Sequence, residues 1–186
     1  MMPELSLNVL DIAQNSVKAR ASLIGITVEA DTAKDLLTII IEDNGCGMTE
    51  EQINKVTDPF FTTRTVRKVG LGVPFFKMAA ETAGGSFKIS SSVNVGTTVT
   101  AVFVLSNIDR MPLGDMPATI HSLVTLNSHI DFVYKFKVDD REFVMDTREF
   151  RAVLGDSARF DIPEVSSFIK SYLEENSAEV TSGVIL

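Results

Sequence analysis

The sequence predicts an α/β fold, and three observations support this prediction. Apolar or small residues recur in steps of three and four between positions 5 and 23, which is typical of a helix with one face against a core. Residues 24–30 alternate apolar and polar side chains, and residues 36–41 form a β-branched apolar run, so both indicate strands. The glycine-flanked segment 70–85 has an early proline and a final glycine pair, which predicts another helix.

Shorter elements are expected between and after these. Thr49 and Gln52 form a capping box, which predicts a short helix from about residue 50 to 57. Residues 87–92 and 97–105 indicate two paired strands with a short turn between them. The first part of the chain therefore mixes helices with strands.

The last part of the chain, residues 107–186, predicts a small α+β extension. A proline-containing connector is followed by helices and by a hairpin with apolar alternation, at residues 118–126, 130–138 with 142–146, 147–154 and 163–174. These pieces are too few for a large independent core, so we expect the extension to pack against the first part. It carries no chemical motif, and its expected use is dimerisation or the binding of a partner.

Length and composition limit the classes of function. The chain has 186 residues, of which 45% are hydrophobic, and this is enough for one good core. Its formal net charge of -8 argues against nucleic acid or an anionic membrane as the main partner. A single cysteine excludes an internal disulfide and fits a reducing compartment. Because we find neither a membrane-length apolar run nor a signal peptide, we expect a cytoplasmic location.

The first candidate functional segment is residues 43–48, Asp-Asn-Gly-Cys-Gly-Met, at the end of a predicted strand. The carboxylate of Asp43 needs a hydrogen-bond donor once it is taken out of water. Gly45 and Gly47 allow a positive φ and let another group approach the backbone closely. Asn-Gly after a strand is also the sequence of a plain turn, so this segment alone leaves both interpretations open.

A second candidate lies on the first predicted helix. Asp11, Asn15 and Lys18 project from one face, within about 60° of one another, at 100° per residue. By themselves these residues also fit a solvated face with an ion pair. In the functional interpretation, the amide oxygen of Asn15 binds a hard cation, since such cations prefer oxygen ligands. Lys18 would then neutralise phosphate oxygens, and Asp11 would hold or activate a water.

A third candidate leads into the 70–85 helix. Residues 58–64 read Asp-Pro-Phe-Phe-Thr-Thr-Arg, and Arg67 and Lys68 stand before Gly-Leu-Gly at residues 70–72. A glycine-flanked loop that opens a helix binds anions, because the first amide groups lack partners inside the helix. Gly-X-Gly is a weak signal alone, and the phenylalanine pair also fits a loop that one ring anchors in the core. The two basic residues favour the anion site.

Taken together, these segments resemble the ATP-binding domain shared by gyrase, Hsp90, histidine kinases and MutL (GHKL), most closely its histidine-kinase branch. The resemblance covers residues 4 to about 105 and rests on the order of Asp11-x-x-x-Asn15-Ser16-Val17-Lys18, Asp-Asn-Gly-Cys-Gly-Met, Asp-Pro-Phe-Phe-Thr-Thr-Arg, Gly-Leu-Gly and Gly96-Thr97-Thr98-Val99. It implies a two-layer α/β sandwich of a mixed β-sheet with helices on one face, formed by residues 1–106, with residues 107–186 as the α+β extension. The nucleotide would lie between the helices and a lid.

The resemblance also implies roles for individual residues. Asp43 would accept a hydrogen bond from the exocyclic amine of adenine, and Thr97 would support the same edge directly or through a water. Gly45 and Gly47 would let the base lie against the main chain. Asn15 would coordinate Mg²⁺.

For the phosphates, the resemblance implies contacts from Lys18 and from the lid. Arg64, Arg67 and Lys68 would add positive charge there. The residues expected to bind ATP with Mg²⁺ are Asn15, Lys18, Asp43, Gly45, Gly47, Met48, Phe60, Thr63, Arg64, Lys68, Gly70, Leu71, Gly72 and Thr97.

Asp11 is the candidate catalytic residue. In gyrase-like members and in the serine kinases that inhibit sigma factors, a glutamate four residues before the asparagine is the general base, and aspartate is one methylene shorter. His121 and His129 lie beyond the resemblance, and neither is expected to be phosphorylated. We therefore expect a stand-alone Mg-ATP-binding regulator that is a slow ATPase, or a kinase for serine or histidine on a separate protein, with a homodimer as one form. The alternative is a non-enzymatic ATP/ADP sensor that signals by lid closure.

Overall fold

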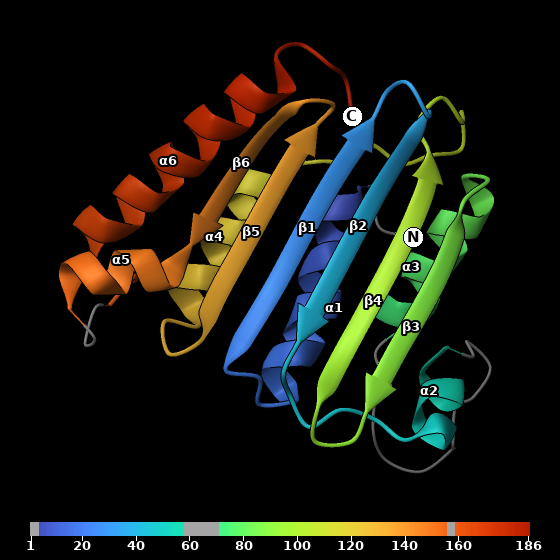
Figure 1. Ribbon diagram of the computed structural model, residues 1–186, viewed down its shortest axis with the longest axis horizontal. Coiled ribbons are helices and arrows are strands. Elements are labelled where there is room, and N and C mark those ends of the chain that lie inside the picture. Colours follow the sequence, from blue (N-terminus) through green and yellow to red (C-terminus); the bar gives the residue numbers. More distant parts are fainter. Residues whose placement is uncertain (1–3, 58–70, 156–158) are drawn as a thin grey trace.

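The structure is a computed structural model that describes residues 4–57, 71–155 and 159–186 (Figure 1). The helices are α1 (Leu5–Lys18), α2 (Glu50–Thr57), α3 (Gly72–Thr82), α4 (Met116–Leu126), α5 (Thr147–Leu154) and α6 (Pro163–Thr181). The strands are β1 (Leu23–Asp31), β2 (Leu36–Asp43), β3 (Ser86–Ser92), β4 (Gly96–Val104), β5 (Asp131–Val138) and β6 (Arg141–Asp146).

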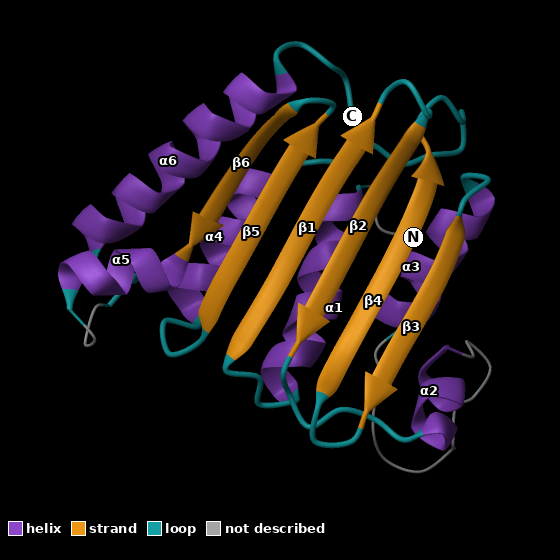
Figure 2. Ribbon diagram, viewed as in Figure 1, coloured by secondary structure: helices purple, strands orange, loops and turns teal. Residues whose placement is uncertain are grey.

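Among the described residues, the strands form one mixed sheet in the order β3-β4-β2-β1-β5-β6. Neighbouring strands are antiparallel except for β1 and β5, which pair in parallel. Helices α1, α3 and α4 lie together behind the sheet (Figure 2). The predicted α/β fold, a mixed sheet with helices on one face, is therefore confirmed.

The core fills the space between the sheet and these helices. Every second residue of β1 is buried, from Ile24 to Ala30, while the residues between them are only partly covered. On the helix side, Leu5, Val9 and Ile12 of α1 are at most 3% exposed. Strand alternation and helical periodicity thus place the two apolar faces against each other, as the sequence predicts.

The C-terminal residues continue the same sheet. Strand β5 pairs with β1 from Leu23↔Asp131 to Ala30↔Val138, and β6 then forms a hairpin with β5. Helix α4 packs behind this hairpin, and α6 packs on α4 and on both strands of the hairpin. The predicted hairpin and its flanking helices are present, and β5 joins the extension to the first part of the chain by pairing with β1.

Two helix boundaries differ from the predictions. Helix α1 ends at Lys18 rather than near residue 23, because Arg20 adopts a left-handed conformation with φ of 60° and turns the chain into β1. Helix α6 runs to Thr181, beyond the predicted residue 174, since Ser177 and Val180 continue its buried stripe. The capping box of α2 is confirmed by hydrogen bonds in both directions between Thr49 and Gln52.

Candidate functional site

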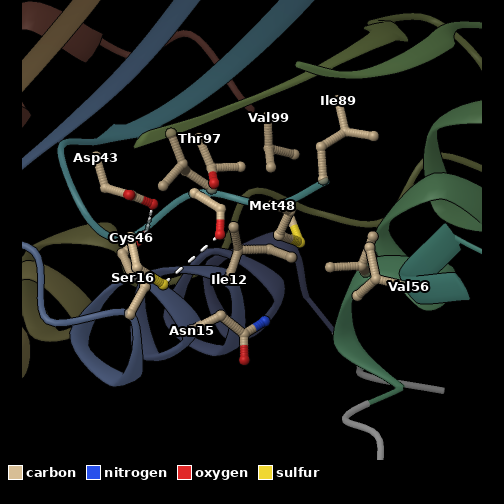
Figure 3. A pocket seen from close by; sticks show the side chains of 14 residues that line it. Ile12, Asn15, Ser16, Asp43, Cys46, Met48, Val56, Ile89, Thr97 and Val99 are labelled. Atoms are coloured by element: carbon tan, nitrogen blue, oxygen red, sulfur yellow. Dashed lines mark hydrogen bonds between the residues drawn. The ribbon is translucent and has the colours of Figure 1, made fainter. Parts of the chain in front are cut away.

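A cavity of about 160 Å³ opens between α1 and the ends of β2 and β4 (Figure 3). Its walls are largely apolar, with Ile12, Ile41, Val73 and Val99 among them. The polar or turn residues that line it are Asn15, Ser16, Asp43, Cys46, Gly47 and Thr97, and Ala19, Met48, Val56 and Ile89 complete the lining. A narrow apolar slot with a few polar groups is suited to a flat, partly polar molecule.

Asp43, the last residue of β2, is held from two sides. Its Oδ2 accepts a 2.6 Å hydrogen bond from Ser16 Oγ, and its Oδ1 accepts one of 2.9 Å from the Gly45 amide. Figure 3 shows this carboxylate above α1, at one end of the cavity. The donors satisfy part of the hydrogen-bonding capacity of a half-buried anion and leave lone pairs for a ligand.

The turn after Asp43 is closely packed against two other segments. A Cβ on Gly45 would lie 2.8 Å from the carbonyl oxygen of Ala19, and the Cys46 amide donates to that same oxygen at 3.0 Å. Gly47 has a φ of +64°, and a Cβ there would lie 1.9 Å from the carbonyl oxygen of Ser92. Both glycines are therefore required by the fold of the turn itself.

Thr97 stands beside Asp43, because the two residues are direct partners in the β2–β4 ladder. Its Oγ1 lies 2.9 Å from Ser91 Oγ of β3. Ser91 Oγ also accepts from the Met48 amide and donates to the Gly96 carbonyl, both at 2.8 Å. Ser91 thus ties the 43–48 turn to the start of β4.

Asn15 lies farther along α1. Figure 3 shows its amide on the side of the cavity away from Asp43. The amide is half-buried and makes no hydrogen bond to any residue that the structure describes. It is therefore available to a ligand at that end of the cavity.

The other two polar residues of the α1 face are placed differently. Lys18 is exposed and does not line the cavity. Asp11 does not line it either, and its carboxylate packs against the first residue of α3, where a Cβ on Gly72 would lie 2.1 Å from Asp11 Oδ2. This position beside a helix N-terminus suits an anion, because unpaired amides and the helix dipole favour negative charge there.

The segment before α3 is described only from Leu71 onward. Leu71 is 46% exposed, whereas Gly72 is buried under Asp11. Five predicted ligand residues lie outside the described residues, namely Phe60, Thr63, Arg64, Lys68 and Gly70.

Sequence reasoning gave no role to Ser16 and Ser91, which are the two serines that organise the site. Ser16 is only 4% exposed on the apolar face of α1, and a buried hydroxyl on such a face signals a hydrogen-bond partner. Ser91 falls on the inward-facing phase of β3 with Phe87 and Ile89. In both cases the partner is distant in sequence, so the pattern alone does not identify it.

Comparison with known proteins identifies the family of the chain. The model of the family described as histidine kinase-, DNA gyrase B-, and HSP90-like ATPase matches residues 3–107. The chain therefore belongs to this family, and the resemblance inferred from the motifs is confirmed. Within the family, its relatives include sensor kinases, so the matched part is an ATPase domain of the histidine-kinase type.

Sporulation kinase B of Bacillus subtilis is 33% identical over 98 residues, which are 52% of this chain and 23% of the kinase. The signal transduction histidine-protein kinase AtoS of Escherichia coli is 27% identical over 106 residues, 57% of this chain and 17% of the kinase. The matched part thus spans about a fifth of each kinase.

Among solved structures, one described as the N-terminal domain of a DNA repair protein superposes with a TM-score of 0.56 at 14% identity. The match covers 96% of this chain and 57% of that one, so the likeness in fold extends to the C-terminal hairpin and helices. In the described part of the chain, no helix has the length and apolar character needed to cross a membrane.

Proposed function

We propose that the chain binds ATP together with Mg²⁺ in the cavity between α1, the 43–48 turn and α3. One observation carries this proposal. Asn15, Asp43 and Thr97 come from three segments of the sequence and line a single apolar slot, with polar groups at its two ends. This is the arrangement that a purine with a charged tail requires.

At the base end, the carboxylate of Asp43 would accept a hydrogen bond from the exocyclic amine of adenine. Ser16 and Gly45 fix the carboxylate before the ligand arrives, so little conformational entropy would be lost on binding. Ile12, Ile41 and Val99 would cover the faces of the base, and burial of apolar surface would add to the affinity.

At the phosphate end, the residues present fit a magnesium ion that arrives with the nucleotide. Mg²⁺ is commonly held by one or two protein oxygens together with phosphates and waters, and the Asn15 amide offers one such oxygen. Within residues 4–57, 71–155 and 159–186, no cluster of three His, Cys, Asp or Glu side chains would hold a metal without the nucleotide. When bound, the ion would neutralise charge on the phosphates.

Asp11 is the proposed catalytic residue. Its carboxylate would accept the proton of an attacking water, which gives slow hydrolysis of ATP to ADP and phosphate. With a hydroxyl or imidazole of a separate protein as the nucleophile, the same step would give a protein kinase. Either activity fits a domain whose relatives include sensor kinases.

The position of Asp11 also favours a second candidate, a non-enzymatic sensor of ATP and ADP. Its carboxylate packs on Gly72 and does not line the cavity. In this candidate, nucleotide would change the contact between α1 and α3. The C-terminal hairpin, which is connected through β1 to the strand β2 that carries Asp43, would report that change to a protein partner.

One assay separates the two candidates. The wild type and the Asp11→Asn variant are incubated with Mg-ATP and phosphate release is followed, with Glu175→Gln on the exposed face of α6 as a control. An enzyme predicts release that only Asp11→Asn abolishes. A sensor predicts saturable ATP binding without release in all three proteins. If ATP does not bind the wild type at all, both candidates are wrong.

A further inference from the structure

The hydrogen bonds of Ser91 determine the direction of a neighbouring hydroxyl. A serine hydroxyl offers one proton and two acceptor positions. Ser91 Oγ gives its proton to the Gly96 carbonyl, and it accepts from the Met48 amide. Its remaining acceptor position faces Thr97 Oγ1 at 2.9 Å. Because the single Ser91 proton is already given to a carbonyl, Thr97 must be the donor in this contact.

Thr97 consequently presents only lone pairs to the cavity. The same is true of the carboxylate of Asp43 and the hydroxyl of Ser16 at this end. The Asp43 carboxylate accepts hydrogen bonds only, and Ser16 gives its proton to Asp43 Oδ2 at 2.6 Å. Carboxylate and hydroxyls together therefore present a set of acceptors to whatever lies between them (Figure 3).

This set of acceptors has a specific complement. Asp43 and Thr97 are direct partners across the β2–β4 ladder, and side chains of such partners are about 5 Å apart at Cβ. A primary amine between them has two protons and can donate one to each. A carbonyl oxygen in the same place would face lone pairs on both sides and would donate no hydrogen bond to either acceptor.

We propose that Ser91 is a positioning residue for base specificity, which makes the site prefer a purine with an exocyclic amino group over one with a carbonyl at that position. It acts through Thr97, whose proton it directs away from the cavity. The inference rests on the proposed nucleotide-binding function and adds the residue that controls the choice of base.

The test measures the ratio of the dissociation constants for inosine triphosphate and ATP, by calorimetric titration with Mg²⁺. In the wild type we expect ATP to bind about 100-fold more tightly. In Ser91→Ala the Thr97 proton is released and can be donated to the inosine carbonyl. The ratio should fall by about tenfold, mainly through tighter binding of inosine triphosphate. Ser90→Ala, on the exposed phase of β3, is the matched control and should keep the wild-type ratio.

Ser91→Ala also removes a hydrogen-bond partner from Met48 and Gly96, which is expected to lower stability. A second variant, Thr97→Val, therefore tests the same proposal. It removes the acceptor without changing the shape of the side chain, and it should also lower the ratio by about tenfold. If both variants still bind ATP and their ratios stay within about twofold of the wild-type ratio, the proposed role of Ser91 is overturned and the proposed nucleotide binding is not. Failure of the wild type to bind ATP would instead overturn the proposed function as well.

Discussion

The two ends of the cavity are built in different ways. At the base end, Asp43 accepts a hydrogen bond from Ser16 of α1, and Thr97 donates one to Ser91 of β3. At the phosphate end, the side chains of Asp11, Asn15 and Lys18 make no hydrogen bond to a described residue. The fold therefore preorganises the groups that we propose for recognition of the base, whereas the groups proposed for the metal and the phosphates depend on the ligand for their partners. We therefore expect some substitutions to affect folding, others to affect ATP binding, and others to affect ATP binding only when Mg²⁺ is present.

The largest effect is expected from Gly47→Ala, which tests how tightly the base end is built. A Cβ at this position would lie 1.9 Å from the Ser92 carbonyl oxygen, and the φ of +64° disfavours alanine as well. We expect the free energy of unfolding to fall by about 3 kcal/mol or more, measured by urea denaturation. Gly183→Ala is the control, because Gly183 has a φ of +86° with no atom within 4 Å. A similar loss in both variants would mean that backbone strain, and not the contact with Ser92, explains the effect.

The next effect is expected from Asp43→Asn, which keeps the shape of the side chain and removes its charge. Loss of a charge-assisted hydrogen bond to adenine should weaken ATP binding by about 1.5–3 kcal/mol, with and without Mg²⁺. Titration calorimetry under both conditions measures this. The control is Glu42→Gln, since Glu42 is exposed and precedes Asp43 on the other face of β2. Unchanged affinity in Asp43→Asn would remove Asp43 from the base site.

Unlike Asp43→Asn, Asn15→Ala should weaken ATP binding only when Mg²⁺ is present. We expect it to abolish the part of the ATP affinity that Mg²⁺ adds and to leave metal-free binding unchanged within about 0.5 kcal/mol. Titrations with Mg²⁺ and with a chelator give the two values. Gln14→Ala, one residue earlier on α1, is the control. If the variant loses the same affinity with and without the ion, Asn15 contacts the nucleotide in some other way.

The smallest effect is expected from Lys18→Met. Lys18 is exposed at the end of α1, so any attraction to phosphate is screened by solvent and salt. We expect ATP binding to weaken by less than about 1 kcal/mol at low ionic strength, and the difference to vanish near 1 M salt. A larger loss that persists at high salt would place Lys18 in direct contact with the phosphates.

Much of this organisation follows from local sequence patterns. The alternation of residues 24–30 and the run from residue 36 identified β1 and β2, and the Thr49–Gln52 capping box identified the start of α2. These patterns depend only on residues that are close in sequence, so they can be recognised from the sequence alone. Asp43, Asn15 and Thr97 also line one cavity.

The remainder depends on contacts between distant segments. The parallel pairing of β1 with β5 joins residues more than a hundred positions apart, and the local periodicity of apolar residues does not predict this pairing. The hydrogen bond from Ser16 to Asp43 and the contacts of Ser91 likewise form only when helix and strands have packed. The sequence pattern does not predict the end of α1, because apolar residues continue from the helix into β1. The chain leaves the helix at Arg20, which has a left-handed conformation.

The most direct test of the account is a calorimetric titration of the wild type and of the double variant Asp43→Asn/Asn15→Ala with ATP and Mg²⁺. We expect saturable binding at one site in the wild type. We also expect the losses of binding free energy in the two single variants to add in the double variant, because the substitutions lie at opposite ends of the cavity. Binding of equal strength in the wild type and the double variant, or no binding in the wild type, would contradict it.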